Sequence, residues 1–272
     1  MPLLRNFLAL SGAALLLLFA AIALAAGWLY PGDPLDMVAA PLLWPGEDMA
    51  FPLGTDPMGR DLAAGLAHGA RASLAVGFYA AFVGVAIGTL VGAAGGYFGG
   101  WLDEVLTRIT ELFQTIPTML LAIVIIAIAS PSTETVALAI GLASWPTIAR
   151  LVRAQFRALR EADFVTAARS VGYGDLRIIF GEILPNALPP IVVTTSVMVA
   201  SAILLESALS FLGMSDPDKM SWGTMIGNGR EMLRTAWYLS ALPGAAISLV
   251  VLALNLLGDG LNDHFNPRLR QR

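Results

Sequence analysis

Residues 161–185 read EADFVTAARSVGYGDLRIIFGEILP and form the longest charge-bearing run among segments that are otherwise apolar enough for lipid. Apolar blocks flank this run on both sides, at 136–145 and 191–205. Four of its apolar residues fall at i, i+3, i+4 and i+7: Phe164, Ala167, Ala168 and Val171. This spacing predicts one amphipathic helical face.

The same run contains residues that end one helix and begin another. Gly172 or Gly174 can supply the left-handed conformation that stops the first helix. Asp175 is expected to cap a second helix over residues 176–183, and Pro185 to prevent its continuation. A pair of capped, polar helices between apolar segments indicates a docking surface for a soluble partner.

The composition of the whole chain is that of a polytopic membrane protein. Of its 272 residues, 57% are apolar and 13% are charged, whereas about a quarter of the residues in soluble domains are charged. The chain has no cysteine, which excludes a disulfide framework and a thiolate metal site. We therefore predict an all-α membrane fold.

Six segments are apolar and long enough to cross the membrane as helices, at about 7–29, 73–97, 116–130, 135–155, 187–212 and 239–261. The first could be a cleaved signal peptide, because Ala23-Leu24-Ala25 resembles a cleavage site. Its length favours an uncleaved span. In the second, Gly84, Gly88 and Gly92 repeat every four residues, which predicts a close helix contact.

The distribution of basic residues predicts which loops face the cytoplasm. Eleven of them fall on the side that also holds both termini: Arg5, Arg108, Arg150, Arg153, Arg157, Arg160, Arg169, Arg177, Arg268, Arg270 and Arg272. The other five are Arg60, Arg71, Lys219, Arg230 and Arg234. The positive-inside rule therefore places both termini and residues 161–185 in the cytoplasm, and the 30–72 loop outside.

Three further segments carry local predictions. Asp56 followed by Pro57 is typical of a helix start. Residues 101–114 are amphipathic, so they either lie at the inner interface or extend the third span. Three aromatic residues are expected in a belt at the outer interface: Trp222, Trp237 and Tyr238.

The usual motifs of ATP binding, metal binding and hydrolysis are missing from the sequence. There is no G-x-x-x-x-G-K-[ST] loop, and the sole lysine, Lys219, lies in a loop predicted to be external. His68 and His264 fall on opposite sides of the membrane by the predicted topology, so they cannot share a metal in one chain. No serine stands in a G-x-S-x-G context. An intramembrane enzyme is therefore poorly supported.

Glu206 is an ionisable residue within an apolar run. A carboxylate in the membrane marks a transport pathway or a partnered interior site, and a packing hydrogen bond near the outer end of the span is the alternative. Both interpretations stay open, and Asn255 and Asp259 in the last span raise the same question. We take three residues as candidates for the pathway or its gate: Glu206, Ser210 and Asn255.

With these residues in view, the 161–185 run resembles the cytoplasmic EAA loop in the permease subunits of ABC importers. The family pattern is EAA, three residues, Gly, nine residues and I-x-L-P. Thr166 stands where the family has Glu, and Glu182 where it has Ile, but the spacing is intact. The resemblance implies that the loop docks an ATPase through seven residues: Thr166, Ala167, Ala168, Arg169, Gly172, Leu184 and Pro185.

Other blocks are similar to the dipeptide/oligopeptide/nickel branch of that family, and to its C-type subunit. The blocks are LGTD at 53–56, GRD at 59–61, GYFGG at 96–100, LSFLG at 209–213, SWG at 221–223 and NLLGD at 255–259. The ending at 262–267 resembles R-D-x-L-D-P, with Asn262 and Asn266 as departures. Together these blocks cover the chain from about residue 50 onward.

The resemblance implies a type I importer (MetI-like) permease with six spans, in the bacterial inner membrane. It implies a homologous second permease chain, two ATPase subunits and an extracytoplasmic solute-binding protein as partners, with lipid around the chain and no nucleic acid. This chain would hold no cofactor, because ATP and Mg would bind in the ATPases. Its parts would be a helix and external loop at 1–71, a permease core at 72–262 and a cytoplasmic tail at 263–272.

The cargo implied by the branch is short peptides, and three alternatives are weighed beside it. A nickel or metal-chelate importer is the nearest one, since a chelate would need no His or Met cluster. An ion-coupled secondary transporter has only Glu206 in its favour. An intramembrane enzyme lacks a nucleophile paired with a base.

Overall fold

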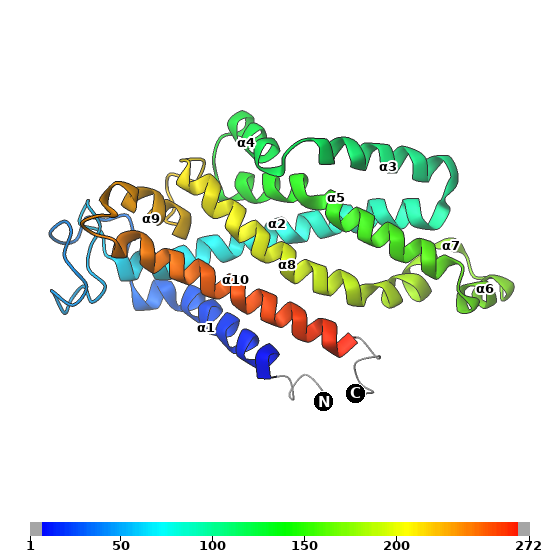
Figure 1. Ribbon diagram of the computed structural model, residues 1–272, viewed down its shortest axis with the longest axis horizontal. Helices are drawn as coiled ribbons and strands as arrows, with labels where there is room; N and C mark the ends of the chain where they lie inside the picture. Colours follow the sequence, from blue (N-terminus) through cyan, green and yellow to red (C-terminus); the bar gives the residue numbers. More distant parts are fainter. Residues whose placement is uncertain (1–6, 266–272) are drawn as a thin grey trace.

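A computed structural model describes residues 7–265 of the chain, which are helical without any β-strand in that range (Figure 1). The elements are α1 (Phe7–Leu29), α2 (Leu62–Phe98), α3 (Gly100–Thr115), α4 (Thr118–Ala129), α5 (Thr133–Arg160), α6 (Asp163–Ser170), α7 (Asp175–Arg177), the π-helix η2 (Ile178–Ile183), α8 (Leu184–Phe211), α9 (Trp222–Gly229), the 3₁₀ turn η3 (Arg230–Met232) and α10 (Tyr238–Phe265).

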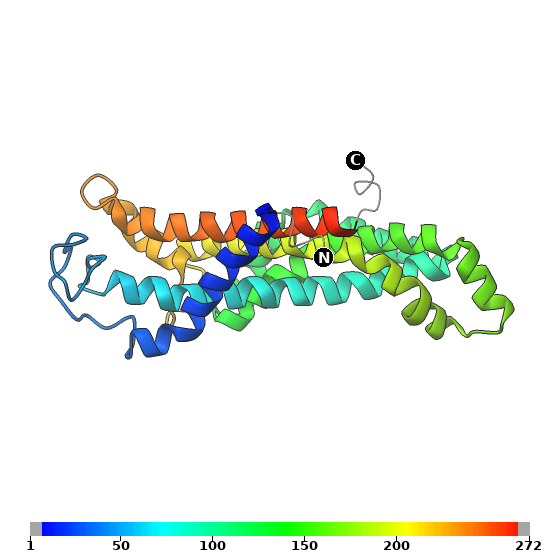
Figure 2. The same cartoon turned by 90° about the horizontal axis from the view of Figure 1, so that it is seen from below.

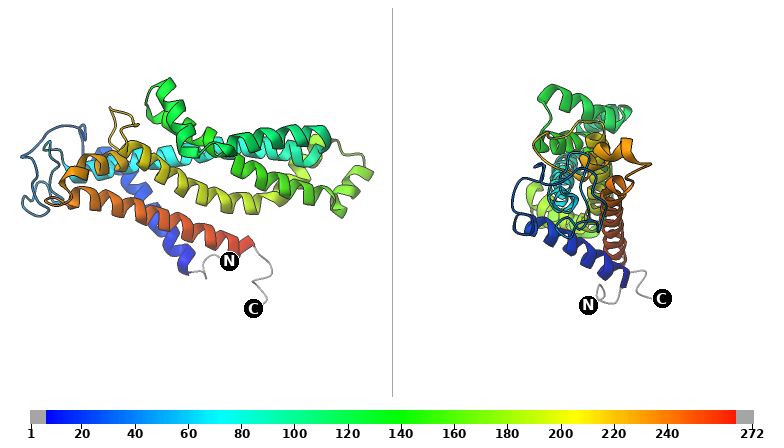
Figure 3. Two further views of the ribbon diagram at one scale, coloured as in Figure 1. Left: turned by 45° about the horizontal axis from the view of Figure 1, so that its top comes forward. Right: turned by 90° about the vertical axis from the view of Figure 1, so that its left-hand side faces the viewer.

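The helices form an elongated bundle with two different ends (Figures 1 and 2). One end carries α6 and α7, and we call it the α6 end; the other carries α9 and the 30–61 loop, and we call it the α9 end. Helices α1 and α10 lie on one side of the bundle, and α3 and α4 lie on the opposite side (Figure 3). The long helices α2, α5 and α8 pack against one another, and α2 and α8 also contact α9 at the far end.

Within residues 7–265, five helices are long and apolar enough to cross a membrane: α1, α2, α5, the continuous run from α7 through α8, and α10. The third predicted span differs, because α4 has only 12 residues, whereas a single span needs about 20. It counts as a sixth span only together with α3, from which it is bent by 86°. Pro117 lies at this bend and cannot continue a helix.

Both predicted alternatives for the amphipathic segment at 101–114, the inner interface or an extension of the third span, stay open, since α3 and α4 qualify as one span only when taken together across their bend. The segment forms α3, which runs along the bundle beside α2 and α5 (Figure 1). An ion pair holds it there, because both guanidinium nitrogens Nε and Nη2 of Arg153 in α5 donate to the Asp103 carboxylate. Amphipathicity alone could not show that the polar face has this partner.

The predicted helix start at Asp56 is wrong, and α2 begins six residues later. Asp61 caps α2 by accepting a hydrogen bond from the Ala63 amide at 2.8 Å. The Asp56 carboxylate instead accepts from the amides of Met58 and Arg60 at 2.8 and 2.9 Å. An aspartate can order a tight turn in the same way that it caps a helix, so the local pattern did not separate the two.

The close contact predicted from the glycines of α2 is confirmed. A Cβ atom at Gly88 would lie 2.7 Å from the carbonyl oxygen of Trp145 in α5, and one at Gly92 would lie 2.9 Å from the amide of Arg153. A Cβ at Gly96 would be 2.7 Å from the Arg153 carbonyl oxygen. The backbones of α2 and α5 therefore approach each other closely along this face.

The predicted aromatic belt is wrong for two of its three residues. Trp222 is fully buried and its indole Nε1 donates to the Leu66 carbonyl at 3.0 Å. Tyr238 is also buried, and its hydroxyl donates to the Leu43 carbonyl at 2.9 Å. Only Trp237 is exposed. Because the polar tips of both rings find backbone partners inside the α9 end, these residues anchor the interior instead of facing lipid headgroups.

Candidate functional site

The predicted docking run begins with α6, which ends in a glycine turn. Gly172 has φ of +88°, whereas Gly174 has φ of −73°, so the predicted left-handed stop is at Gly172. The Gly172 amide donates to the Arg169 carbonyl at 2.9 Å, and the Tyr173 amide donates to the Ala168 carbonyl at 3.1 Å. This is the Schellman arrangement, which reverses the chain at the tip of the bundle.

The predicted apolar stripe of α6 is only partly correct, because its buried face is turned by one residue. Val165 and Ala168 are buried and belong to the core with Phe156 of α5. Phe164 and Val171, which the spacing assigned to the same face as Ala168, are exposed by 38% and 75%. In a helix of eight residues, packing against the rest of the bundle decides which face is buried, and the sequence spacing fits two faces.

The second half of the run also differs from the prediction. Asp175 makes no cap, since its carboxylate accepts the hydroxyl of Tyr97 at 2.6 Å. The helix then runs on through α7, η2 and α8 without stopping at Pro185. The turn before Pro185 is a wider π-turn, in which the Leu184 amide donates to the Ile179 carbonyl. The wider turn makes room for a proline ring that would clash in a regular helix.

The α6 end leaves four large apolar side chains uncovered within 17 residues. We call this set the α6-end surface: Phe164, Val171, Leu176 and Phe180. Leu176 and Phe180 were not predicted as docking residues, although both lie in the LRIIF stretch at 176–180. Among the predicted docking residues, five are exposed, namely Thr166, Ala167, Arg169, Gly172 and Pro185. Ala168 is buried and Leu184 is half-buried, so these two support the surface from inside.

Tyr97, at the end of α2, joins the docking run to the rest of the bundle. Besides donating to Asp175, its ring lies 5.7 Å from the Arg169 guanidinium of α6. Its carbonyl accepts a hydrogen bond from Arg160 of α5 at 3.1 Å. Tyr97 therefore contacts side chains from α5, α6 and α7. In the sequence, Tyr97 is marked only by its place in the GYFGG block.

At the α9 end, Glu206 of α8 is buried among hydroxyl groups. Its carboxylate accepts hydrogen bonds from Ser73 of α2 at 3.1 Å and from Ser210 at 2.7 Å, with Ser207 at 3.4 Å. The Ser73 oxygen in turn accepts the Trp222 amide at 3.3 Å. Glu206 and Ser210 are thus together, and they connect α8 to α2 and α9.

Asn255 does not join Glu206 and Ser210. Its side chain is exposed on α10. Three residues further along α10, Gly258 packs against Ser196 of α8. This contact places Asn255 relative to α8. Glu206 lies ten residues further along α8, or about 15 Å at 1.5 Å per residue. The three predicted pathway residues therefore do not form one site.

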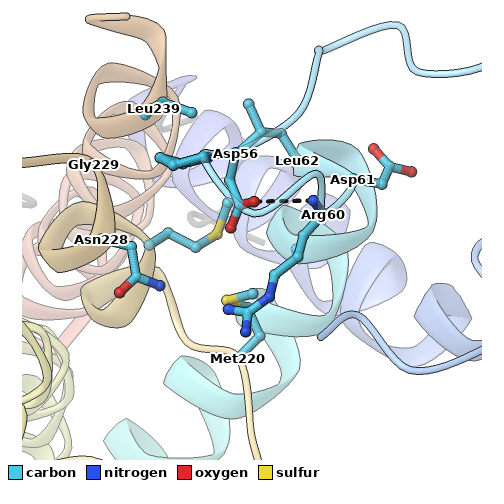
Figure 4. Close-up of a pocket in the computed structure, with 11 residues that line it drawn as sticks. Asp56, Arg60, Asp61, Leu62, Met220, Asn228, Gly229 and Leu239 are labelled. Atoms are coloured by element: carbon cyan, nitrogen blue, oxygen red, sulfur yellow. Dashed lines mark hydrogen bonds between the residues drawn. The ribbon is translucent and has the colours of Figure 1, made fainter. Parts of the chain in front are cut away.

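Neither a metal site nor a large cavity is present at the Asp56 turn. Within residues 7–265, no group of three His, Cys, Asp or Glu side chains could hold a metal ion. A small cavity lies between the Asp56 turn and α9 (Figure 4). Its volume of about 10 Å³ is enough for roughly one water. Arg60 and Asn228 line it, but cargo would not fit.

Comparison with known proteins shows what this bundle is. Residues 84–271 match the family described as binding-protein-dependent transport system inner membrane component. The chain belongs to this family. It is an ABC importer permease, and the apolar helices make it a multi-pass protein of the inner membrane.

Relatives of the permease are similar over almost their whole length. The dipeptide transport system permease protein DppC of Escherichia coli (strain K12) is 42% identical over 273 residues, which cover 98% of this chain and 91% of that protein. The di/tripeptide transport system permease protein DppC of Pseudomonas aeruginosa (strain UCBPP-PA14) is 38% identical over 268 residues, 96% of this chain and 88% of that protein.

Solved structures confirm the fold. A chain of the inward-facing MetNI methionine ABC transporter has a TM-score of 0.62 at 20% identity, with coverage of 74% of this permease and 96% of that chain. An amino acid ABC transporter solved with histidines has a TM-score of 0.54 at 16% identity, with coverage of 71% and 90%. The expected all-α, MetI-like permease fold is therefore confirmed.

Proposed function

We propose that this permease is the non-catalytic membrane subunit of an ATP-driven importer of short peptides. It would form the pathway with a homologous second permease, receive cargo from an extracytoplasmic solute-binding protein, and be driven by two ATPase subunits that hold ATP and Mg. The observation that carries the proposal is the α6-end surface, whose apolar side chains have no cover within the described chain. The DppC names of the relatives support peptides as cargo.

The geometry suggests how an ATPase would move this subunit. From Asp175 to Phe211 the chain is one continuous helical run, so a push at the α6 end reaches α8 without an intervening loop. The Tyr97–Asp175 hydrogen bond couples the same movement to α2. Closure of the ATPases on ATP would open the pathway outward, and hydrolysis would reset it inward, as a two-state interface biased by nucleotide.

We also propose that the α6 end faces the cytoplasm, as the excess of basic residues there indicates. Gly12, early in α1, packs against Ala253 and Leu257, late in α10, which supports both termini on that side. Most of the proposed tail at 263–272, with Arg268, Arg270 and Arg272, lies outside the described residues, as does Arg5. Because α2 starts at Leu62, the proposed first part, 1–71, includes the first turns of that helix.

For the pathway residues, we propose that Glu206 and Ser210 hold the gate at the α9 end. The hydroxyls around the carboxylate support this role better than a direct contact with cargo. An ion-coupled carrier loses its main argument for the same reason, since Glu206 is 97% shielded from solvent by these partners and the surrounding helices (3% exposed). Asn255 stays a prediction.

The proposal is tested by uptake into proteoliposomes that contain the purified complex and its binding protein. We expect uptake of a labelled dipeptide that requires ATP on the ATPase side and is unaffected by collapse of a proton gradient. Competition by a nickel chelate in place of peptides would favour the metal-chelate alternative. Uptake driven by the gradient without ATP would contradict the proposal.

A further inference from the structure

A groove of about 520 Å³ lies between α5, α8 and the corner where α3 meets α4. This is within the usual range of about 300–1,000 Å³ for small-molecule sites. On α5 its wall is formed by residues at helical spacing, including Ser144, Thr147 and Arg150. On α8 it includes Thr194 and Ser201, and Gln114 comes from α3.

Among the described residues that line this groove, Arg150 alone is charged. Its side chain is exposed and makes no ion pair or hydrogen bond within residues 7–265. Arg153 is paired with Asp103 and Arg160 with Glu161, whereas Arg157 has no ion pair among the described residues but does not line the groove. Arg150 belongs to the basic residues that the positive-inside rule assigns to the cytoplasmic side, and its guanidinium has no anionic partner among the described residues. The groove therefore presents an unsatisfied cation.

Other charges close to Arg150 are already paired. A second cavity of about 380 Å³ shares Arg150 and Gln114 with the groove and reaches Glu111 and Arg153. Glu111 accepts a hydrogen bond from Arg108 at 3.1 Å, and Arg153 is held by Asp103. Glu111, the carboxylate that lines this second cavity, is therefore paired with Arg108 and not with Arg150.

The rest of the groove combines free hydroxyls with an apolar wall. The hydroxyls of Thr147 and Ser201 have no hydrogen-bond partner within the described range, although both side chains are exposed there. Val197 and Leu205 of α8 supply apolar surface on the same wall. A ligand that fits this groove would have one anionic end for Arg150 and polar groups along its length for the hydroxyls. The apolar wall would accept side chains of different shapes.

We infer that Arg150 binds the terminal carboxylate of a short peptide in this groove. The inference rests on the proposed function as a peptide importer. Every free peptide carries one C-terminal carboxylate whatever its side chains, and Arg recognises a carboxylate through two parallel hydrogen bonds. Because Arg150 would bind the carboxylate that all free peptides share, and the apolar wall would not select among their side chains, one site could bind many different peptides.

The test uses the full transporter complex in nanodiscs without the binding protein. The native chain has no cysteine, so Ser201→Cys reports on the groove through its rate of maleimide labelling. Two peptides are compared, a tripeptide with a free carboxylate and the same tripeptide with an amidated C-terminus. Arg150→Gln removes the cation, and Arg157→Gln is the matched control, since Arg157 is exposed on α5 but does not line the groove. Thr115→Cys, exposed outside the groove, controls for general protection.

We expect the free-acid peptide to slow labelling of Ser201→Cys at least fivefold and the amide to slow it less than twofold. Arg150→Gln should remove this difference, Arg150→Lys should keep part of it because a point charge remains, and Arg157→Gln should keep all of it. Labelling of Thr115→Cys should not respond to peptide.

Equal protection by acid and amide, or protection that survives Arg150→Gln, would overturn the inference. So would Ser201→Cys that is unreactive without peptide, because the second permease would then fill the groove. Uptake of dipeptide by the wild-type complex is measured in parallel. If uptake occurs without protection, this inference fails while the proposed function stands; if no peptide is taken up, the proposed function fails.

Discussion

The two ends of the permease differ in how many of their polar and aromatic side chains find partners within the chain. At the α9 end, Trp222 is fully buried, and Glu206 is surrounded by hydroxyl donors from two helices. At the α6 end, Val171 and Leu176 are exposed by 75% and 71%. Both ends expose large apolar side chains, with Met49 and Trp237 among them at the α9 end, but the α9 end also gives a buried carboxylate and a buried indole their hydrogen-bond partners within one chain. The difference separates residues that hold the fold from residues that hold a partner.

The largest expected effect at the α9 end is that of Trp222→Ala. The indole packs on Gly69 of α2, meets Phe19 of α1 edge to face at 5.7 Å, and donates to Leu66. Its removal should cost about 3–5 kcal/mol of stability. Thermal unfolding of the purified complex measures this. Trp237→Ala, at an exposed tryptophan, should change the midpoint little, and equal losses would refute the contrast between the two residues.

A smaller loss is expected for Glu206→Ala, which leaves the hydroxyls of Ser73 and Ser210 without their acceptor. Buried groups that lose a partner cost about 1–3 kcal/mol. Glu206→Gln keeps one acceptor oxygen and should cost less. Glu134→Ala is the control, because Glu134 is exposed and its ion pair with Lys219 is long at 3.8 Å. If Glu206→Ala unfolds no earlier than wild type but transport stops, Glu206 contacts cargo instead of holding the gate.

At the α6 end, Tyr97→Phe removes one hydrogen bond to Asp175. A bond to a carboxylate is worth about 1.5 kcal/mol, which corresponds to roughly a tenfold change in a local equilibrium. Hydrogen exchange of the 163–180 amides should therefore speed up by as much as about tenfold. Tyr79→Phe, an exposed tyrosine on the same helix, should leave exchange there unchanged. If exchange of these amides is unchanged in Tyr97→Phe, the Tyr97–Asp175 hydrogen bond does not couple the 163–180 segment to α2.

The smallest effect is expected at Asp216, in the loop before α9. Burial alone would raise the pKa of its carboxyl. Hydrogen bonds from Thr133 and the Asp218 amide, together with the nearby Lys219 charge, outweigh this effect, so the pKa lies below its ordinary value. The stability that this carboxylate contributes is thus present above the unfolded pKa of about 3.9. It is lost as pH falls through the lower folded pKa.

Asp216→Asn should cost less than about 1 kcal/mol at neutral pH, because the amide keeps an acceptor oxygen. The difference from wild type should shrink as the pH is lowered below about 4. Thermal midpoints of both proteins between pH 7 and pH 3 measure it. A difference that grows with acid would reverse the sign and contradict the assignment.

The same contrast explains what the sequence could predict. Helical class, most spans, the glycine contact of α2 and the turn at Gly172 follow from local composition and spacing. Partners distant in sequence do not: Asp175 binds Tyr97, which is 78 residues away, and Trp222 binds Leu66. From its neighbours in sequence alone, a tryptophan is predicted to lie in the aromatic belt and an aspartate to cap a helix. Only the tertiary contacts show that Trp222 and Asp175 do neither. The buried face of α6 was misread for the same reason.

Site-specific photo-cross-linking in the assembled importer tests the central claim most directly. The chain has no cysteine, so Val171→Cys, Val165→Cys and Leu233→Cys can each carry a thiol-linked benzophenone. Val171 and Leu233 are exposed at opposite ends, and Val165 is buried on the same helix as the docking surface. We predict that the probe at residue 171 cross-links an ATPase subunit, that position 165 labels poorly, and that position 233 labels without an ATPase cross-link. ATPase cross-links from position 233 and none from 171 would contradict the account.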